Sequence, residues 1–394
     1  MNPGANIQVQ RGENMFCYVR GRVALCAILR ALQLQPGDEV LLQAFTCLAV
    51  PSPIVGLGLT PVYVDVDPGT CNMNPALIEA LITKRSRAIV VQHTFGIPAP
   101  LSAIMQVARK HGLVVIEDCC HALGSRYDGR DLGSFGDAAF YSYEWGKPIV
   151  IGVGGAAIIH SESILEAVRS QYESYLKPPV RDVVIVNLQY AAHSVLRRPV
   201  WFWAVRDAYR ALSRSGVIIS SFQEEEFEGK LNLGYDTRMS GVLHRRLSLK
   251  LREGSVRQSV ARRAQLSRDY EACMRRLGSE CFTPPAGSET VFLRFPLLAR
   301  DKRKVLEEAR ENHIEIGDWF SSPVHPLTQE QWAKVAYKKG SCPFAETLSQ
   351  RIVTLPLHEG IRPSDTVRTL DFVGRMVSAG YLERDAMTAE RDNR

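Results

Sequence analysis

From about residue 20 to residue 160, two hydrophobic patterns alternate along the chain. Residues 23–35 and 100–112 place apolar side chains at helical spacing, whereas 39–45 and 113–120 contain short runs of consecutive apolar residues. The same order, a helix and then a strand, is predicted at 51–59 and 61–66 and again at 74–83 and 88–95. Amphipathic helices that alternate with strands lacking a polar face are typical of a mainly parallel sheet flanked by helices. The pattern therefore predicts an α/β fold.

The pattern changes after residue 160. Residues 170–232 are rich in aromatic residues and arginine, and their helix-length segments fit no alternation of strand and helix, so we interpret them as an insertion. Shorter segments from 283 to 385 predict a smaller α+β domain. A chain of 394 residues is long enough for two domains. We predict a large domain at 18–282 and a small C-terminal domain at 283–385, with the boundary in the proline-containing stretch 283–289.

Charge is concentrated in one stretch. The chain has 48 Lys and Arg against 42 Asp and Glu, a net charge of +6, and residues 242–276 alone carry ten basic against three acidic residues. That stretch has helical periodicity, which indicates a long helix with a solvated basic face. Attraction of an anionic ligand or a membrane surface is the alternative. No aromatic interleaving accompanies the charge, so we expect no nucleic-acid partner.

Three aromatic residues, Trp201, Phe202 and Trp203, lie inside the predicted insertion. Core packing, a substrate cleft, a dimer surface and a membrane interface all remain open for them. We further predict that the segment 197–210 contributes to recognition of a large anionic or lipid-linked substrate.

The sequence lacks targeting, membrane-spanning and metal-binding patterns, and this leads to predictions about localisation and metal sites. No signal-peptide core is present, and no stretch approaches the roughly 20 apolar residues of a membrane-spanning helix. We therefore expect a cytoplasmic protein. The nine cysteines have no metal-ligand spacing, so most are expected to be small buried hydrophobes and no metal site is predicted.

Polar residues follow three of the predicted strands. Thr46, His93 and Asp118 each lie at or just beyond the end of a different strand, and ligands of parallel sheets bind beyond the carboxyl ends of the strands. We expect the three side chains to converge on one crevice. A carboxylate at Asp118, after the buried run "LVVIE", is costly unless a cation or a strong donor meets it. The alternative role for Asp118 is to cap the segment that follows it.

Lys147 stands between an aromatic run and a glycine-rich run, in "FYSYEWGKPIVIGVGG". A single lysine is most often an exposed structural residue. Here it belongs to a set that also contains Asp118, His121 and Ser142, and glycines follow it. Pyridoxal phosphate needs a carboxylate at its pyridine nitrogen, a lysine for its aldehyde, and hydroxyls or a helix N-terminus for its phosphate. The set therefore predicts a pyridoxal 5'-phosphate site.

The stretch 117–159 resembles the DegT/DnrJ/EryC1/StrS family of sugar aminotransferases, as a divergent subgroup. Residues 32–75, 93–104, 234–240 and 342–361 resemble other parts of that family, so that the likeness spans about 18 to 375 apart from the insertion. It implies a type I aminotransferase-like fold and a homodimer. It also implies transfer of an amino group from an amino acid, glutamate or glutamine, to a keto-sugar, with a nucleotide-linked sugar favoured.

The resemblance also implies roles for single residues. Lys147 would form the Schiff base with the cofactor, Asp118 would pair with the pyridine nitrogen, and His121 would lie near the ring hydroxyl. Ser142 and the step from Gly21 to Arg22, which opens the first predicted helix, would hold the phosphate.

The chain departs from the family pattern at three positions. Cys47 stands where an aromatic ring usually stacks on the cofactor, Arg22 replaces a small hydroxyl residue, and Asp236 replaces an Asn that reaches the neighbouring subunit's phosphate. An Asp there repels phosphate unless Arg22 or Arg238 neutralises it.

We also predict three substrate contacts, at Tyr235, Arg238 and His325. A sugar dehydratase is disfavoured because those relatives replace the lysine with histidine. A catalytically inactive binding protein and an enzyme acting on a non-sugar ketone stay open.

Overall fold

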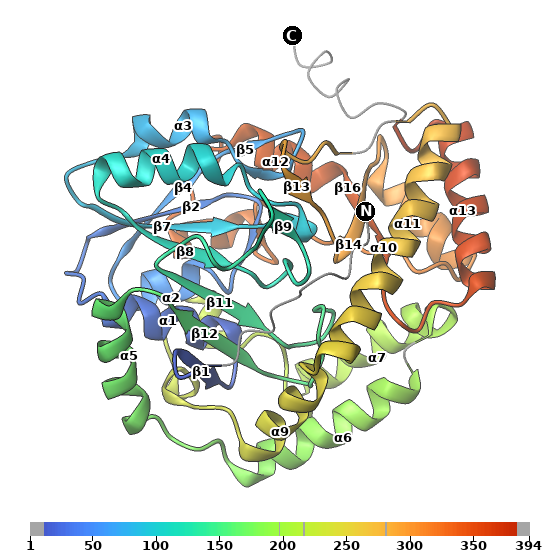
Figure 1. The fold of residues 1–394 in the computed structure, drawn as a ribbon. Coiled ribbons are helices and arrows are strands. Elements are labelled where there is room, and N and C mark those ends of the chain that lie inside the picture. The colour runs from blue at the N-terminus through green and yellow to red at the C-terminus, as the bar shows by residue number, and fades with distance from the viewer. Residues whose placement is uncertain (1–11, 197, 216, 280–281, 384–394) are drawn as a thin grey trace.

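The computed structural model of the chain describes residues 12–196, 198–215, 217–279 and 282–383. At its centre lies a seven-stranded sheet with the order β1-β12-β11-β8-β7-β2-β4 (Figure 1). Its strands are β1 (Met15–Tyr18), β2 (Glu39–Gln43), β4 (Thr60–Val64), β7 (Ser86–Gln92), β8 (Val114–Asp118), β11 (Ala138–Ser142) and β12 (Gly155–Ile159). The strands from β4 to β11 are parallel, and β12 and β1 add an antiparallel edge. The predicted α/β fold with a mainly parallel sheet is confirmed.

Helices cover both faces of this sheet. One face packs on α3 (Pro75–Leu81) and α4 (Leu101–His111), and the other on α1 (Gly21–Ala31), α2 (Pro51–Gly56) and α5 (Glu162–Ser174). Both faces of the central strands are therefore buried, which explains why their sequences lack a polar side.

Local sequence sets the ends of the helices. The side chain of Asn74 accepts a hydrogen bond from the backbone N–H of Ala76 at the start of α3, and a proline follows the cap. At the end of α4 the chain turns in the left-handed region at Gly112, with φ 63°. These signals fix where the helices stop and where the next strands begin.

The region after β12 is helical, as its sequence indicates. It contains α5, α6 (Val180–Leu196), α7 (Phe202–Arg214), α8 (Glu224–Phe227), α9 (Gly241–Lys250) and α10 (Glu253–Arg276). The single basic helix predicted at 242–276 is wrong, because the chain breaks between α9 and α10 at Leu251 and Arg252. The basic face is also not fully solvated, since Arg263 is buried and donates to the carbonyl of Leu123.

The three aromatic residues of the predicted insertion have different environments. Trp203 is buried and its indole N–H donates to the carbonyl of Ile314 at 2.8 Å, whereas Trp201 is 54% exposed. Phe202 is half-buried against the core. Residues 197 and 216 of the insertion lie outside the described part of the chain.

The C-terminal segment builds a smaller layer beside the sheet (Figure 1). It consists of the antiparallel pair β14 (Arg294–Leu298) and β16 (Ile352–Pro356) with α11 (Lys302–Glu311), α12 (Pro343–Arg351) and α13 (Pro363–Ser378). Its buried residues belong to the same hydrophobic cluster as α1 and the adjacent face of the sheet. The predicted boundary at 283–289 leads into this layer, and residues 384 and 385 of the predicted small domain lie outside the described residues.

Short elements complete the chain. They are β3 (Thr46–Cys47), β5 (Val66–Asp67), β6 (Asn72–Met73), β9 (Arg126–Tyr127), β10 (Arg130–Asp131), β13 (Ser288–Glu289), β15 (Val324–His325) and the 3₁₀ helices η1 (Thr94–Gly96), η2 (Pro199–Trp201), η3 (Leu233–Asp236) and η4 (Gln329–Val335). Among the described residues, no helix combines the length and the apolar character that crossing a membrane requires.

Candidate active site

Lys147 lies in the loop between β11 and β12, at the carboxyl edge of the parallel strands. Its backbone N–H donates to the carbonyl of Glu144 at 3.2 Å, which closes a tight turn. Its Nζ atom lies 3.1 Å from Nε2 of His121 and 4.7 Å from the ring centroid of Trp319. The amine is therefore held at the edge where ligands of such sheets bind.

The imidazole of His121 has a defined orientation. Its Nδ1 accepts a hydrogen bond from the backbone N–H of Phe95 at 3.2 Å, and the two rings are stacked. Burial and the nearby charges of Lys147 and Arg294 hold the pKa of His121 well below its usual range, so the ring is neutral. A neutral ring that accepts at Nδ1 carries its proton on Nε2, the atom that faces Lys147. The fold therefore holds Nε2 of His121 within hydrogen-bonding distance of Lys147 Nζ.

Asp118 is the last residue of β8, a strand that is buried from Val115 onward. Its carboxylate accepts from the backbone N–H of Cys120 at 3.0 Å, and burial raises its pKa although Lys147 lies near enough to oppose that rise. No ion pair to a described residue neutralises the Asp118 carboxylate. A cationic N–H group of a ligand would fill that need.

The N-terminus of α1 lies directly against the end of β11. A Cβ atom on Gly21 would stand 3.0 Å from Cβ of Ser142 and 3.1 Å from the carbonyl oxygen of Tyr141, so a side chain here would force the helix end and the strand slightly apart. The residue before the helix, Arg20, makes no side-chain cap to the first turn. The first backbone N–H groups of α1 and the hydroxyl of Ser142 are therefore available together for an anion.

Buried ion pairs between two arginines and two glutamates lie at this end of α1. Arg22 pairs with Glu226 and donates to the carbonyl of Ser221 at 2.5 Å, while Arg20 pairs with Glu144 at 3.2 Å. The side chain of Arg22 is thus committed to the segment around α8, and burial opposes the rise in its pKa that Glu226 and Glu144 cause. Of the predicted phosphate contacts at Gly21 and Arg22, the backbone N–H groups are the ones that stay open.

The ion-pair partner of Asp236 differs from the two that the sequence suggested. It forms an ion pair with Arg30 at 2.5 Å, not with Arg22 or Arg238. Arg30 belongs to the last turn of α1, so Asp236 joins the loop 234–240 to the end of that helix. The charge that was expected to repel phosphate is compensated inside the same chain.

The other predicted residues are spread around the lysine. Cys47 pairs in register with His325, across β3 and β15, and burial raises its pKa although Lys147 and Arg22 oppose the rise. The hydroxyl of Tyr235 is buried and donates to Glu226 at 2.8 Å. The backbone of Arg238 forms a bridge to Tyr18.

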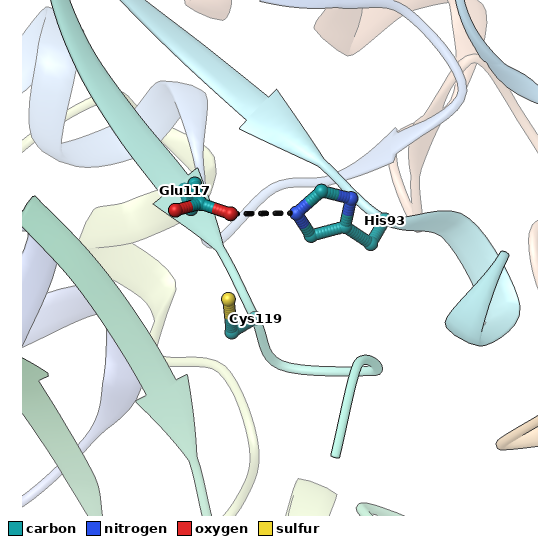
Figure 2. Close-up of side chains that lie close together, drawn as sticks. All are labelled: His93, Glu117 and Cys119. Carbon is teal, nitrogen blue, oxygen red and sulfur yellow. Dashed lines mark hydrogen bonds and ion pairs between the residues drawn. The ribbon is translucent and has the colours of Figure 1, made fainter. Parts of the chain in front are cut away.

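His93 does not join the site, and the prediction that it converges there with Asp118 is wrong. His93 is fully buried, and Figure 2 shows its ring directed at Glu117, 3.2 Å away. Successive residues of a strand point to opposite faces, so Glu117 and Asp118 face different sides of the sheet. Thr46 donates its hydroxyl to Gln92 at 2.7 Å and is likewise engaged within the fold.

Cys119 completes the group drawn in Figure 2, whose ligand-type atoms lie within 4.8 Å of one another. The group is held together by hydrogen bonds. Glu117 accepts backbone N–H bonds at 2.9, 2.6 and 2.9 Å from Gly133, Phe135 and Gly136, besides the bond to His93. Burial alone would raise the pKa of Glu117, but these bonds lower it, so the carboxylate is a fully used structural acceptor.

Three residues of the site were missed by sequence reasoning. Glu144 had a signal, because it is an acid between Ser142 and Lys147 in a stretch that is otherwise apolar or aromatic. The signal for Arg20 was its position directly before Gly21, the first residue of the predicted phosphate-binding step. Trp319, whose ring lies under Lys147, had none, because it comes from the C-terminal segment and only the fold brings it there.

Comparison with known proteins identifies the family of the chain. The sequence profile of the DegT/DnrJ/EryC1/StrS aminotransferase family matches residues 17–373. The chain belongs to this family. The predicted membership is confirmed over nearly the whole chain.

Two relatives of known name illustrate the range of the family. The chain is 28% identical over 355 residues to the UDP-N-acetyl-3-dehydro-alpha-D-glucosamine 3-aminotransferase of Acidithiobacillus ferrooxidans, covering 90% of this chain and 82% of that protein. It is 39% identical over 152 residues to the L-glutamine:scyllo-inosose aminotransferase of Streptomyces griseus, covering 39% of this chain and 35% of that protein.

The fold also matches a solved structure. The Streptomyces venezuelae protein DesV, solved in complex with a ketimine intermediate, superposes with a TM-score of 0.66 at 24% identity, over 92% of this chain and 84% of that chain. The match confirms the predicted type I aminotransferase fold.

Family members bind pyridoxal phosphate, and the residues of this chain fit it. Asp118 is a buried carboxylate without an ion-pair partner among the described residues. The open N-terminus of α1 beside Ser142 suits a phosphate, and Lys147 lies near enough to Asp118 to influence its pKa. Each part of the cofactor has a matching group.

Proposed function

We propose that this protein is a pyridoxal-phosphate-dependent aminotransferase that moves an amino group from an amino acid, glutamate or glutamine, to a keto-sugar. The observation that carries the proposal is the placement of Lys147 Nζ 3.1 Å from His121 Nε2, at the sheet edge where Asp118 also ends its strand. Family membership supports the reaction class.

Each residue of the candidate site has a separate role in the proposed reaction. Lys147 Nζ would anchor the cofactor and, once released, would carry the proton between the substrate carbon and the cofactor carbon. Asp118 would hold the pyridine nitrogen protonated, and His121 would lie beside the ring hydroxyl. The first turn of α1 and Ser142 would hold the phosphate. The bound cofactor supplies an electron sink for the substrate carbanion.

Aromatic rings and the burial of Asp118 support the same reaction. His121 and Trp319 contact the amine, and the rings of Phe95 and Phe320 pack against His121. Asp118 is itself buried, which would strengthen its interaction with a cationic ring.

The keto acceptor is proposed as a nucleotide-linked sugar, by analogy with the relative that spans most of this chain. A keto-cyclitol is the second candidate, because the scyllo-inosose relative reaches higher identity over part of the chain. We also propose a homodimer, as the family resemblance implies.

The test is spectroscopic. We expect purified protein with pyridoxal phosphate to show the visible absorption band of a lysine-bound cofactor, and L-glutamate to bleach it. Lys147→Ala should lack the lysine-bound form. Lys110→Ala is the matched control, because that amine is 64% exposed and paired with Glu79 far from the site.

The spectrum also separates the alternatives. No band in the unmodified protein, even at saturating pyridoxal phosphate, would contradict the proposal and favour an inactive binding protein. A band that L-glutamate and L-glutamine both leave unchanged would contradict the amino donors. With a working half-reaction, a screen of keto-sugars against keto-cyclitols then decides the acceptor class.

A further inference from the structure

The large apolar side chains that stand exposed are concentrated in one region of the chain. Among the described residues fifteen large hydrophobic side chains are exposed, and twelve of them lie between residues 176 and 249. Single exposed apolar residues are ordinary on a protein surface, whereas a contiguous group marks a surface that another body covers. The region from α6 to α9 therefore needs an occupant.

The outer side of α6 carries the longest run of this group. Val180, Val184, Leu188 and Val195 are 80, 52, 67 and 75% exposed. Their spacing of four, four and seven residues places them on one face of the helix. With 17 residues the helix is about 25 Å long, so the stripe extends along most of it.

The inner side of α6 is also occupied by apolar and aromatic contacts. Val186 is buried in one cluster with Ile151, and the ring of His193 lies 4.8 Å from that of Trp145. Both partners belong to the loop that carries Lys147. A helix that is apolar all round is normally covered all round, and here only the inner side is covered by described residues.

Helix α9 extends the same surface. It lies beside α6 at the lower edge of Figure 1, where Arg246 is hydrogen-bonded to Asn187 and its Cζ atom lies 3.9 Å from the ring centroid of Tyr190. Two of its apolar side chains, Val242 and Leu249, are 55 and 45% exposed. We call the exposed residues of 180–201 and 241–250 the α6–α9 face.

The charge of these two segments has one sign. Together they contain six Lys and Arg residues against a single acid, Asp182. Arg181, Arg198, Arg245 and Lys250 are exposed beside the apolar stripe. The α6–α9 face thus combines apolar side chains with cations and almost no anionic group.

We propose that the α6–α9 face binds the surface of a lipid bilayer that contains anionic phospholipids. The valines and leucines of the stripe enter the boundary between headgroups and acyl chains, and the cations meet the lipid phosphates. Trp201, 54% exposed at the end of η2, has the amphipathic ring that favours such a boundary. Binding would hold the Lys147 loop about 10 Å, one helix thickness, from the bilayer.

Charge favours a bilayer over a second copy of the chain. A twofold interface brings the same patch of both copies together, so the six cations of one copy would face those of the other. Like charges in that position oppose association, and the centres of protein interfaces are depleted of charged residues. An anionic bilayer complements both the apolar and the cationic part. The inference goes beyond the proposed aminotransferase reaction and does not depend on it.

The experiment is cosedimentation of the full chain with lipid vesicles. We compare vesicles of phosphatidylcholine alone with vesicles of phosphatidylcholine and phosphatidylglycerol in equal parts. The unmodified protein should bind the anionic vesicles about tenfold or more tightly than the neutral ones, and added salt should weaken that binding. No binding to the anionic vesicles, or equal binding to both kinds, would overturn the proposal.

An apolar pair tests the stripe itself. Val184→Asn combined with Leu188→Asn should weaken binding to the anionic vesicles by about tenfold or more. The matched control combines Val367→Asn and Leu77→Asn, at side chains 57 and 39% exposed outside the α6–α9 face, and should bind as the unmodified protein does. Equal binding by the two double variants would overturn the proposal. So would a halved mass of the first in light scattering, which would make the face an interface between copies.

Two single changes keep the test open if the double variant does not fold. Arg181→Gln should weaken binding by about fivefold, whereas Arg303→Gln, at a side chain 82% exposed on α11, should leave it unchanged. Anionic vesicles should shift the tryptophan fluorescence to shorter wavelength, and Trp201→Phe should remove most of that shift. A shift that persists in Trp201→Phe, together with unchanged binding by Arg181→Gln, would contradict the proposed surface.

Discussion

At the scale of single residues, burial determines which groups of the site carry charge. His325 is the clearest case, because burial lowers its pKa from the ordinary 6.5 to about 4. Its Nδ1 accepts from the hydroxyl of Ser321 at 2.9 Å, so the neutral ring is the form that the fold stabilises.

The pH dependence of stability follows from that shift. Between pH 6.5 and about 4 the unfolded chain binds a proton at His325 and the folded chain does not, so the free energy of unfolding falls as the pH falls through this window. One such group contributes at most about 1.4 kcal/mol per pH unit. We expect His325→Gln to show a shallower fall in urea titrations at several pH values, whereas His244→Gln, at an exposed position, should match the unmodified protein. Parallel curves for all three proteins would refute the assignment. His121 contributes in the same direction, so part of the slope persists in the variant.

At the scale of elements, the contact between α1 and β11 makes the proposed phosphate site. The helix end is open because Arg20 does not cap it, and the strand brings Ser142 to the same point. The geometry depends on the absence of a side chain at Gly21.

We therefore expect Gly21→Ala to weaken pyridoxal phosphate binding by about tenfold or more, since a new methyl group would separate the helix end from Ser142. The dissociation constant is measured by fluorescence or absorbance titration. Gly374→Ala is the matched control within a helix: no atom lies within 4 Å of its added methyl, and we expect it to stabilise α13 by about 0.5–1 kcal/mol. Unchanged cofactor affinity in Gly21→Ala would place the phosphate elsewhere.

At the scale of the whole molecule, the site depends on how the C-terminal segment docks on the sheet. Trp319, Arg294 and His325 come from that segment, whereas Lys147 and Asp118 come from the sheet. One direct link between the two is Asp65, just beyond β4, whose carboxylate accepts the backbone N–H groups of Phe344 and Ala345 at 2.9 Å each. A helix of one part is thus capped by a residue of the other.

We expect removal of the Asp65 cap to weaken donor binding at the candidate active site. We expect Asp65→Ala to lower the free energy of unfolding by about 1–2 kcal/mol and also to raise the half-saturating concentration of L-glutamate. Asp301→Ala removes a comparable cap, the bond from Lys304 N–H to Asp301, but inside the C-terminal segment itself. It should cost similar stability in denaturant titrations and leave donor binding unchanged. Equal donor effects in the two variants would argue against docking as the cause.

The sequence by itself determined the α/β core and the local part of the site. The hydrophobic period, the order of elements and the strand ends depend on near neighbours in the chain, so the parallel sheet was predictable. The contact of His121 with Lys147 agrees with the predicted set, and the roles of Asp118, His121, Ser142 and Lys147 stay predictions. The break between α9 and α10 was missed because helical periodicity continues through it, and His93 was misassigned because its burial depends on its pairing with Glu117.

Only the tertiary structure decided which groups meet across long stretches of chain. The ion pairs of Asp236 with Arg30 and of Arg22 with Glu226, and the place of Trp319 under Lys147, join residues that no local pattern relates. The surroundings of Arg294, whose Nε has no hydrogen-bond partner among the described residues, belong to the same class, because they depend on every element packed around it.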